Sequence, residues 1–173
     1  MKGVIVNCLE AMVRERHGID AWERVLERAG LPRDELFLAT RDVDDATVIG
    51  LFDATREIAG ASAEEAADAF GDYWVNEFAP RVYPMYFDHI SSAREMLLAM
   101  DRVHVQTTEI VRGSRPPRFE YRWIDDRTLE IRYRSGRGLI HLAAGLARGV
   151  GRRFDERLDV TVIGDDEMRV VFG

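Results

Sequence analysis

The chain has 173 residues, of which 46% are hydrophobic and 32% are charged, and its formal net charge is −7. This length and composition fit one globular domain with a substantial core, built as a single unit or as two subdomains. The acidic balance argues against a nucleic-acid-binding protein. No apolar run approaches the ~20 residues of a membrane span, and a single cysteine excludes an internal disulfide.

The first segment, Met1 to Asn7, resembles a signal peptide only briefly. Asn7 and Glu10 interrupt its apolar run, and no cleavage site follows. We therefore expect a cytoplasmic protein. Cys8 lies among apolar residues of a predicted helix, which favours a buried, inert thiol.

Apolar residues at helical spacing and cap residues divide the first half of the chain into helices. The first predicted helix carries Ile5, Leu9, Met12 and Val13 at helical spacing. The next three start at Asp20, at Asp44 or Asp45, and at the capping box Ser62–Glu65. Gly18, Gly30 and Gly60 end the first three. The fourth runs toward Phe78, after which Pro80 and Pro84 are expected to break the chain.

A longer helix is predicted from about Ser92 to Val111, and Gly113 with two prolines stops it. The pattern then changes to the period of two that is typical of half-buried strands. Strands are expected around residues 119–123, 129–133, 160–162 and 168–172, with a helix at 139–154 between the second and the third. The predicted fold is α+β, with a helical N-terminal subdomain of about residues 1–62. A subdomain of about residues 63–173 holds a four-stranded antiparallel sheet packed by helices.

Among the four histidines, His104 alone falls on an apolar helical stripe, one heptad after Leu97 and one before Val111. His17, His89 and His141 fall at a helix end, in a connection and on a polar helix face. A buried imidazole needs a partner for its acceptor nitrogen. A core histidine bonded to backbone or water satisfies that need, and heme iron is the alternative.

The segment Tyr133-Arg134-Ser135-Gly136-Arg137 closes the second predicted strand. Alternation along the strand places Tyr133 and Ser135 on the same face as the core residue Ile131, and Arg137 follows. A phenol, an alcohol and a guanidinium together offer donors to an anion, and arginine suits a carboxylate. A solvent-exposed strand end with ordinary surface arginine is the simpler interpretation.

Pro116 and Pro117 stop the long helix, and a stiff apolar ring there can also press on a flat ligand between helix and sheet. An apolar slot, an inward histidine and a donor cluster suit a flat macrocycle with a metal centre and two carboxylates. Heme has that chemistry.

With these features the chain resembles the H-NOX family, the heme-nitric oxide/oxygen binding domains related to the heme domain of soluble guanylate cyclase. The resemblance covers the whole chain. It includes Met1 to Asn7, Phe70 to Val75, Asp101 to His104, Pro116 to Arg118 and Tyr133 to Arg137.

The resemblance implies a heme b (iron protoporphyrin IX) held between the helix and the sheet. His104 would be the iron ligand, Tyr133, Ser135 and Arg137 would bind the propionates, and Pro117 would pack against a pyrrole and bend the heme. The implied distal pocket consists of apolar and aromatic side chains, namely Ile5, Leu9, Trp74, Phe78, Leu142 and Leu146.

The resemblance also suggests which gas binds. Members that hold oxygen stably carry a distal tyrosine, and here Leu142 takes that position. We therefore expect binding of nitric oxide, and of carbon monoxide, without stable oxygen binding. Trp74 complicates this expectation because its indole N–H is a donor, although an amphipathic core aromatic is the simpler role.

The implied function is a bacterial gas sensor that is not an enzyme. Nitric oxide would weaken the bond from iron to His104, release its helix and shift the subdomains. A separately encoded histidine kinase or cyclic-di-GMP enzyme would detect the change. The alternatives are an oxygen sensor, a heme enzyme that consumes nitric oxide or peroxide, and a domain of this fold without heme.

Overall fold

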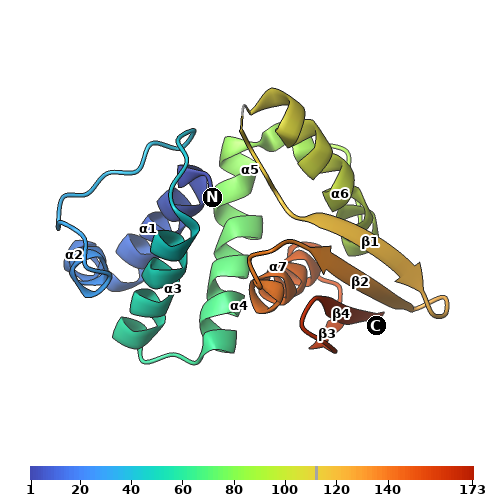
Figure 1. Ribbon diagram of the computed structural model, residues 1–173. Coiled ribbons are helices and arrows are strands. Elements are labelled where there is room, and N and C mark those ends of the chain that lie inside the picture. Colours follow the sequence, from blue (N-terminus) through green and yellow to red (C-terminus); the bar gives the residue numbers. More distant parts are fainter. Residues whose placement is uncertain (112) are drawn as a thin grey trace. The chain divides into compact units, whose positions relative to one another are not determined.

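The structure is a computed structural model that describes residues 1–111 and 113–173 (Figure 1). The chain divides into two compact units, Met1–Ala66 and Ala67–Gly173.

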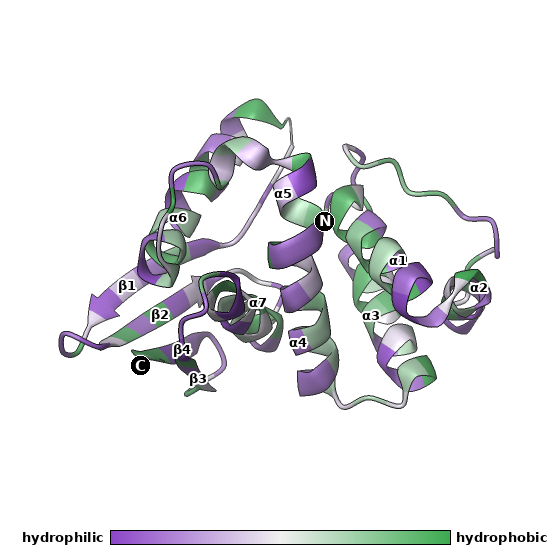
Figure 2. Cartoon of the chain, turned by 180° about the vertical axis from the view of Figure 1, so that it is seen from behind, coloured by the Kyte–Doolittle hydropathy of each residue, from purple (hydrophilic) through white to green (hydrophobic). Residues whose placement is uncertain are grey.

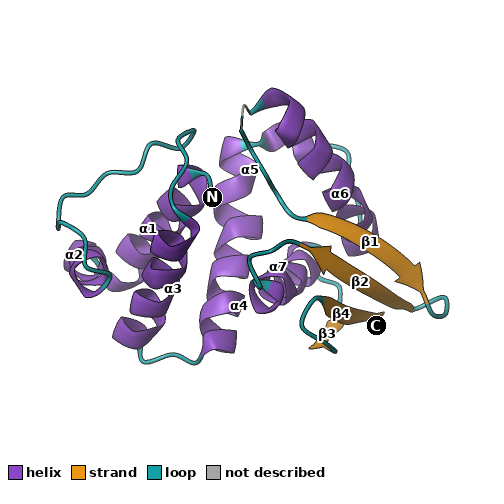
Figure 3. Ribbon diagram, in the orientation of Figure 1, coloured by secondary structure: helices purple, strands orange, loops and turns teal. Residues whose placement is uncertain are grey.

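The first unit is helical. Its helices α1 (Gly3–His17), α2 (Ile19–Arg28) and α3 (Asp45–Ala59) pack on one another, and a long loop joins α2 to α3 (Figure 3). The largest fully buried side chains of the unit come from all three helices and include Leu9, Trp22, Leu26 and Leu51. Cys8 is also buried, as predicted, and burial raises the pKa of its thiol.

Two predicted helix ends are confirmed by their capping geometry. The Asp44 carboxylate accepts hydrogen bonds from the amides of Ala46 at 2.9 Å and Thr47 at 3.3 Å, so it caps α3. Gly60 ends α3 in the left-handed conformation with a φ of 65°. The predicted cap at Asp20 is wrong, because α2 already begins at Ile19 with Gly18 as its N-cap. Asp20 lies in the first turn, where a carboxylate favours the helix dipole.

The capping box that opens the fourth helix is also confirmed. The amide of Ser62 donates to the Glu65 carboxylate at 2.8 Å, and the amide of Glu65 donates to the Ser62 hydroxyl at 3.2 Å. This helix, α4 (Ala63–Tyr73), continues through a π-helical turn, η1 (Trp74–Phe78), into α5 (Ala79–Val82). The predicted break at Pro80 is therefore wrong, since Pro80 lies inside α5. The helix ends before Pro84, which opens the short 3-10 helix η2 (Pro84–Tyr86).

The described strands of the second unit form one four-stranded antiparallel sheet in the order β1-β2-β4-β3. The strands are β1 (Arg118–Trp123), β2 (Thr128–Arg134), β3 (Leu158–Val162) and β4 (Glu167–Phe172), and α7 (Ile140–Arg153) connects β2 to β3. The predicted α+β fold and element order are confirmed. Alternating hydrophobic and hydrophilic residues are visible along β1 and β2 in Figure 2.

One apolar cluster joins the sheet to its helices. Leu129 and Ile131 of β2 and Val170 of β4 are fully buried against residues of α7 and of α6 (Ala93–Ile110). The α6 residues in this cluster are Ala93, Met96 and Leu97. This packing fixes α6 on the sheet through its first half. No helix among the described residues is long and apolar enough to cross a membrane.

Candidate heme and gas-sensing site

His104 projects from the second half of α6 toward the start of β1. Its Nδ1 lies 2.8 Å from the carbonyl oxygen of Pro117, and its ring centroid lies 5.4 Å from that of Phe119. The predicted orientation along the apolar stripe agrees with this position. His17, His89 and His141 are exposed, as the sequence indicated.

The Pro117 carbonyl determines which nitrogen of His104 carries the proton. A carbonyl only accepts, so Nδ1 is the protonated nitrogen and donates. Burial lowers the pKa of His104, which favours the neutral imidazole. Nε2 then carries the lone pair, and none of the described residues donates a hydrogen bond to it. This is the protonation state of a metal-ligating histidine whose second nitrogen is held by a backbone carbonyl.

A second set of contacts ties α6 to β1 beside His104. The Asp101 carboxylate accepts two hydrogen bonds from the Arg118 guanidinium, both at 2.7 Å, and one from the amide of Phe119 at 2.8 Å. The Tyr121 hydroxyl donates to the carbonyl of Leu97 at 2.8 Å. Arg118 lowers the pKa of Asp101 to about 2, and burial raises the pKa of Tyr121 to about 12. These contacts fix the helix on which His104 lies.

The sequence did not reveal this anchor. Asp101 lies one helical turn before His104, and that spacing places both on one side of α6. The pairing with Arg118 spans 17 residues, however, and depends on how α6 packs on the sheet. No local sequence pattern predicts such a pairing.

Tyr133 lies at the end of β2, where only 5% of it is exposed. It pairs in register with Phe119, and the two ring centroids lie 6.0 Å apart. His104, Phe119 and Tyr133 therefore form a row of rings from α6 across β1 to β2.

Ser135 follows directly after β2, which ends at Arg134. Its hydroxyl accepts a hydrogen bond from the amide of Arg137 at 3.4 Å within a turn that Gly138 completes at a φ of 65°. The burial of the residues keeps alternating from Ile131 to Ser135, and Arg134 and Gly136 are the exposed positions. The turn brings Ser135 and Arg137 together.

The segment before β1 contacts both halves of the candidate site. The Arg137 guanidinium donates to the carbonyl of Arg115 at 2.8 Å, while the carbonyl of Pro117 accepts from His104. Ser114, at the start of this segment, is buried. Two carbonyls two residues apart thus connect the candidate iron ligand with the candidate carboxylate-binding arginine.

The residues predicted for the distal pocket lie on three helical elements. Trp74 and Phe78 belong to η1, and their rings stack at 5.7 Å with an interplanar angle of 27°. Leu142 and Leu146 are half-buried on α7. Ile5 and Leu9 lie on α1 in the first unit, where Leu9 is fully buried and Ile5 is half-buried.

Glycines hold α4 and α7 in backbone contact beneath these residues. A Cβ on Gly145 would lie 2.3 Å from the carbonyl oxygen of Ala67, and one on Gly71 would lie 2.3 Å from the carbonyl of Gly145. Ion pairs fasten the same two helices, with Arg148 to Asp68 at 2.6 Å and Arg152 to Asp72 at 2.7 Å. This close approach positions Leu146 relative to η1.

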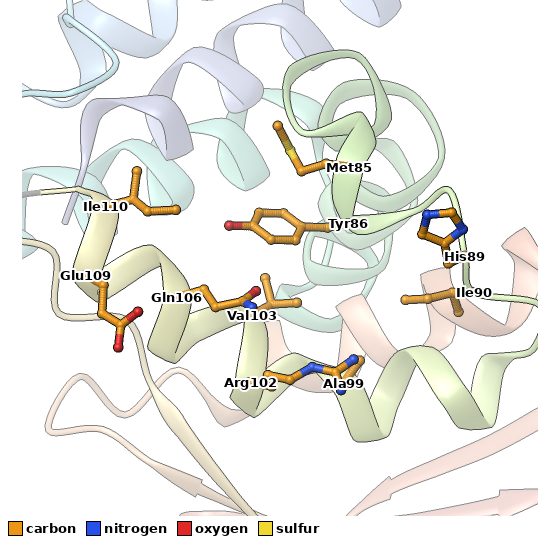
Figure 4. A pocket seen from close by; sticks show the side chains of 10 residues that line it. All are labelled: Met85, Tyr86, His89, Ile90, Ala99, Arg102, Val103, Gln106, Glu109 and Ile110. Carbon is orange, nitrogen blue, oxygen red and sulfur yellow. The ribbon is translucent and has the colours of Figure 1, made fainter.

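A separate cavity of about 750 Å³ lies on another side of α6 (Figure 4). It is lined by residues of α6 and of the segment around η2, namely Met85, Tyr86, His89, Ile90, Ala99, Arg102, Val103, Gln106, Glu109 and Ile110. Helical spacing places residues 99, 106 and 110 on the face of α6 opposite to His104. This cavity is therefore distinct from the histidine site.

The fold and site together define an α+β domain in which a helix presents a neutral histidine beside a donor-rich strand end, the combination expected of a heme-binding sensor domain. The family model described as Haem-NO-binding matches residues 2–162. The chain belongs to this family, the H-NOX domains, which are heme-binding gas sensors related to soluble guanylate cyclase.

Individual relatives agree with this assignment. The chain is 24% identical over 159 residues to soluble guanylate cyclase gcy-37 of Caenorhabditis elegans. The aligned region covers 90% of this chain and 22% of that protein. The chain thus spans about a fifth of this curated relative.

Solved structures are similar over nearly the whole chain. An oxygen-binding H-NOX domain related to soluble guanylate cyclases, in its oxygen complex, has a TM-score of 0.82 at 26% identity, with 99% of this chain and 95% of that chain covered. A structure on the molecular mechanism of H-NOX activation has a TM-score of 0.85 at 26% identity, with 99% of this chain and 96% of that chain covered.

Proposed function

We propose that this chain binds heme b through His104 and senses nitric oxide for a separate effector protein. One observation carries the proposal. The segment before β1 contacts His104 through the Pro117 carbonyl and Arg137 through the Arg115 carbonyl. The candidate iron ligand and the candidate propionate arginine therefore belong to one connected structure.

The donor chemistry of these residues suits heme. A neutral His104 with Nδ1 engaged offers Nε2 to iron. Arg137 and Ser135, brought together by a turn, suit carboxylate groups, and Tyr133 extends the row of rings toward them. The carbonyl of Pro117 holds the imidazole, and the carbonyl of Arg115, two residues earlier, holds Arg137. Bound heme supplies the iron centre that gas ligands reach.

We propose selectivity for nitric oxide, with carbon monoxide as a second ligand, because the proposed distal side chains are mainly apolar. Leu142 stands where oxygen-binding relatives carry tyrosine, and Leu146 and Phe78 add no donor. Trp74 is the exception, and its stacking on Phe78 supports a packing role. Ile5 and Leu9 are assigned to this pocket by the family resemblance. A solved oxygen-binding H-NOX shares the fold, so the proposed selectivity rests on the pocket side chains and not on the fold.

The contacts of α6 support a role in signalling. His104, Asp101 and the carbonyl of Leu97 each bond to the segment 117–121. If the bond between iron and His104 weakened, the change would act on α6, which these three contacts anchor at three successive turns. We propose a separately encoded histidine kinase or cyclic-di-GMP enzyme as the effector. The bacterial origin and cytoplasmic location stay predictions.

Catalysis is the second candidate. Peroxide or nitric oxide turnover generally uses a distal acid–base group, and none of the proposed distal side chains is a histidine or a carboxylate. This composition favours a sensor over a heme enzyme.

An absorption spectrum of the reduced, heme-loaded protein tests the proposal. Nitric oxide and air are added to separate anaerobic samples. A Soret band that shifts with nitric oxide and is not replaced by that of a stable oxygen complex supports it. Absence of a Soret band after heme supplementation contradicts heme binding, and a stable oxygen spectrum contradicts the proposed selectivity.

A further inference from the structure

The helix that carries Trp74 and Phe78 contains one widened turn. The amide of Ala79 donates to the carbonyl of Trp74, five residues back, as in a π-helix. Tyr73 before the turn and Ala79 after it keep right-handed helical dihedral angles. One continuous helix therefore contains a local widening, and such π turns are frequent at functional sites.

Pro80 gives a physical reason for the widening. In an ordinary α-helix the ring of Pro80 would collide with the carbonyl of Asn76, four residues back, and Pro80 has no N–H to donate to it. A turn wider by one residue removes the collision. The Val75 carbonyl cannot make the corresponding π-helical bond, because its donor would be the missing N–H of Pro80.

Side chains compensate for that lost bond and fasten the turn to α7. The Arg153 guanidinium donates to the carbonyl of Val75 at 3.4 Å. The Asn76 amide donates to the Asp72 carboxylate at 3.0 Å and to the carbonyl of Gly149 at 3.3 Å. The widened turn is thus held from α7 at two consecutive residues.

The turn determines the direction of two aromatic rings. Trp74 stacks on Phe70 at 5.9 Å and on Phe78 at 5.7 Å, each with an interplanar angle of 27°. Return to α-helical pairing would remove one residue from the turn. The segments on its two sides would then rotate relative to each other by about 100°, from 3.6 residues per turn. Trp74 and Phe78, four residues apart, would still lie on one side of the helix, but that side would face a different direction relative to α7.

We propose that Pro80 is a positioning residue of the gas site, acting through the π turn that aims Trp74 and Phe78. This inference rests on the proposed function, since it takes these two rings as the distal face of the heme. Pro80 thereby contributes to gas selectivity without contacting the gas.

Pro80→Ala tests this role, because alanine restores the N–H, removes the ring and favours an α-helix. Pro84→Ala is the matched control, since Pro84 is an exposed proline of η2 outside the turn. The first readout is the C–O stretching frequency of the carbon monoxide complex, which reports polarity beside the gas and does not follow global stability. The second readout is the NMR resonance of the Trp74 indole N–H, which is assigned by its loss in Trp74→Phe. This measurement needs no heme.

We expect Pro80→Ala to shift both signals and to change the carbon monoxide dissociation rate by about threefold to tenfold, and Pro84→Ala to change none of them. A shifted Trp74 resonance with an unchanged C–O frequency would overturn the gas-site role. No change in either signal would overturn the positioning role altogether. A parent protein that retains no heme contradicts the proposed function itself, which separates that failure from the other two.

Discussion

The carbonyl oxygen of Pro117 accepts a hydrogen bond from Nδ1 of His104 over 2.8 Å. This bond selects the histidine tautomer whose Nε2 can bind a metal, and it connects α6 to the segment that precedes β1. Pro117 therefore contributes through its backbone, in addition to the ring contact that the family resemblance implies.

We expect His104→Ala to abolish heme retention, because the substitution removes the proposed iron ligand. Added imidazole should restore binding by occupying the space of the lost ring. The measurement is the Soret absorbance of purified protein relative to total protein. His141→Ala, at an exposed position of α7, is the control and should retain full heme content. An undiminished Soret band in His104→Ala would show that another residue binds iron.

Asp101→Asn should destabilise the fold by about 2 kcal/mol at neutral pH, because Arg118 lowers the pKa of Asp101 to about 2. A carboxylate with a lowered folded-state pKa stabilises the protein above its unfolded pKa of about 3.9. That contribution is lost as the pH falls toward 2. The difference in unfolding free energy between parent and variant should therefore shrink between about pH 5 and pH 2.

Urea unfolding at several pH values measures this difference. Asp34→Asn, at an exposed loop position, serves as the control and should leave stability nearly unchanged. A pH-independent gap between the parent and Asp101→Asn would argue that lost packing, and not the ion pair with Arg118, causes the destabilisation.

Local signals in the sequence predicted most of the fold. The capping box at Ser62 and Glu65 and the cap at Asp44 involve residues two or three positions apart, and both form as expected. Pro80 shows where a local rule fails. Proline normally ends a helix, but this helix widens to a π turn, and Arg153 of α7 compensates for the lost bond.

The candidate site was harder to predict from sequence than the fold, because more of its contacts depend on tertiary structure. His104 was identified because its neighbours on the helical stripe are apolar. The Asp101–Arg118 anchor and the contact of Gly145 with Ala67 join distant segments, so no local spacing reveals them. The turn that brings Ser135 close to Arg137 begins directly after β2, and strand alternation alone does not predict it.

Gly145→Ala should destabilise the protein by roughly 2–3 kcal/mol, because its Cβ would meet the Ala67 carbonyl oxygen at 2.3 Å and force α4 and α7 apart. Gly50→Ala is the matched control, a helical glycine of α3 with no atom within 4 Å of the added Cβ. It should stabilise by about 0.5–1 kcal/mol through helix propensity. Thermal or urea unfolding distinguishes the two, and equal effects would contradict the close contact.

Leu142→Tyr should convert the chain into an oxygen-retaining domain if the apolar character of this position sets gas choice. A hydrogen bond from the tyrosine hydroxyl to bound oxygen should slow its dissociation by about tenfold to a hundredfold. Leu142→Phe supplies the same ring without the hydroxyl, so it separates hydrogen bonding from steric effects. The measurement is the oxygen dissociation rate of each reduced protein after rapid mixing with an oxygen scavenger. Similar rates for the tyrosine and phenylalanine variants would show that position 142 does not control selectivity, and retention of oxygen by the parent would direct attention to the indole of Trp74.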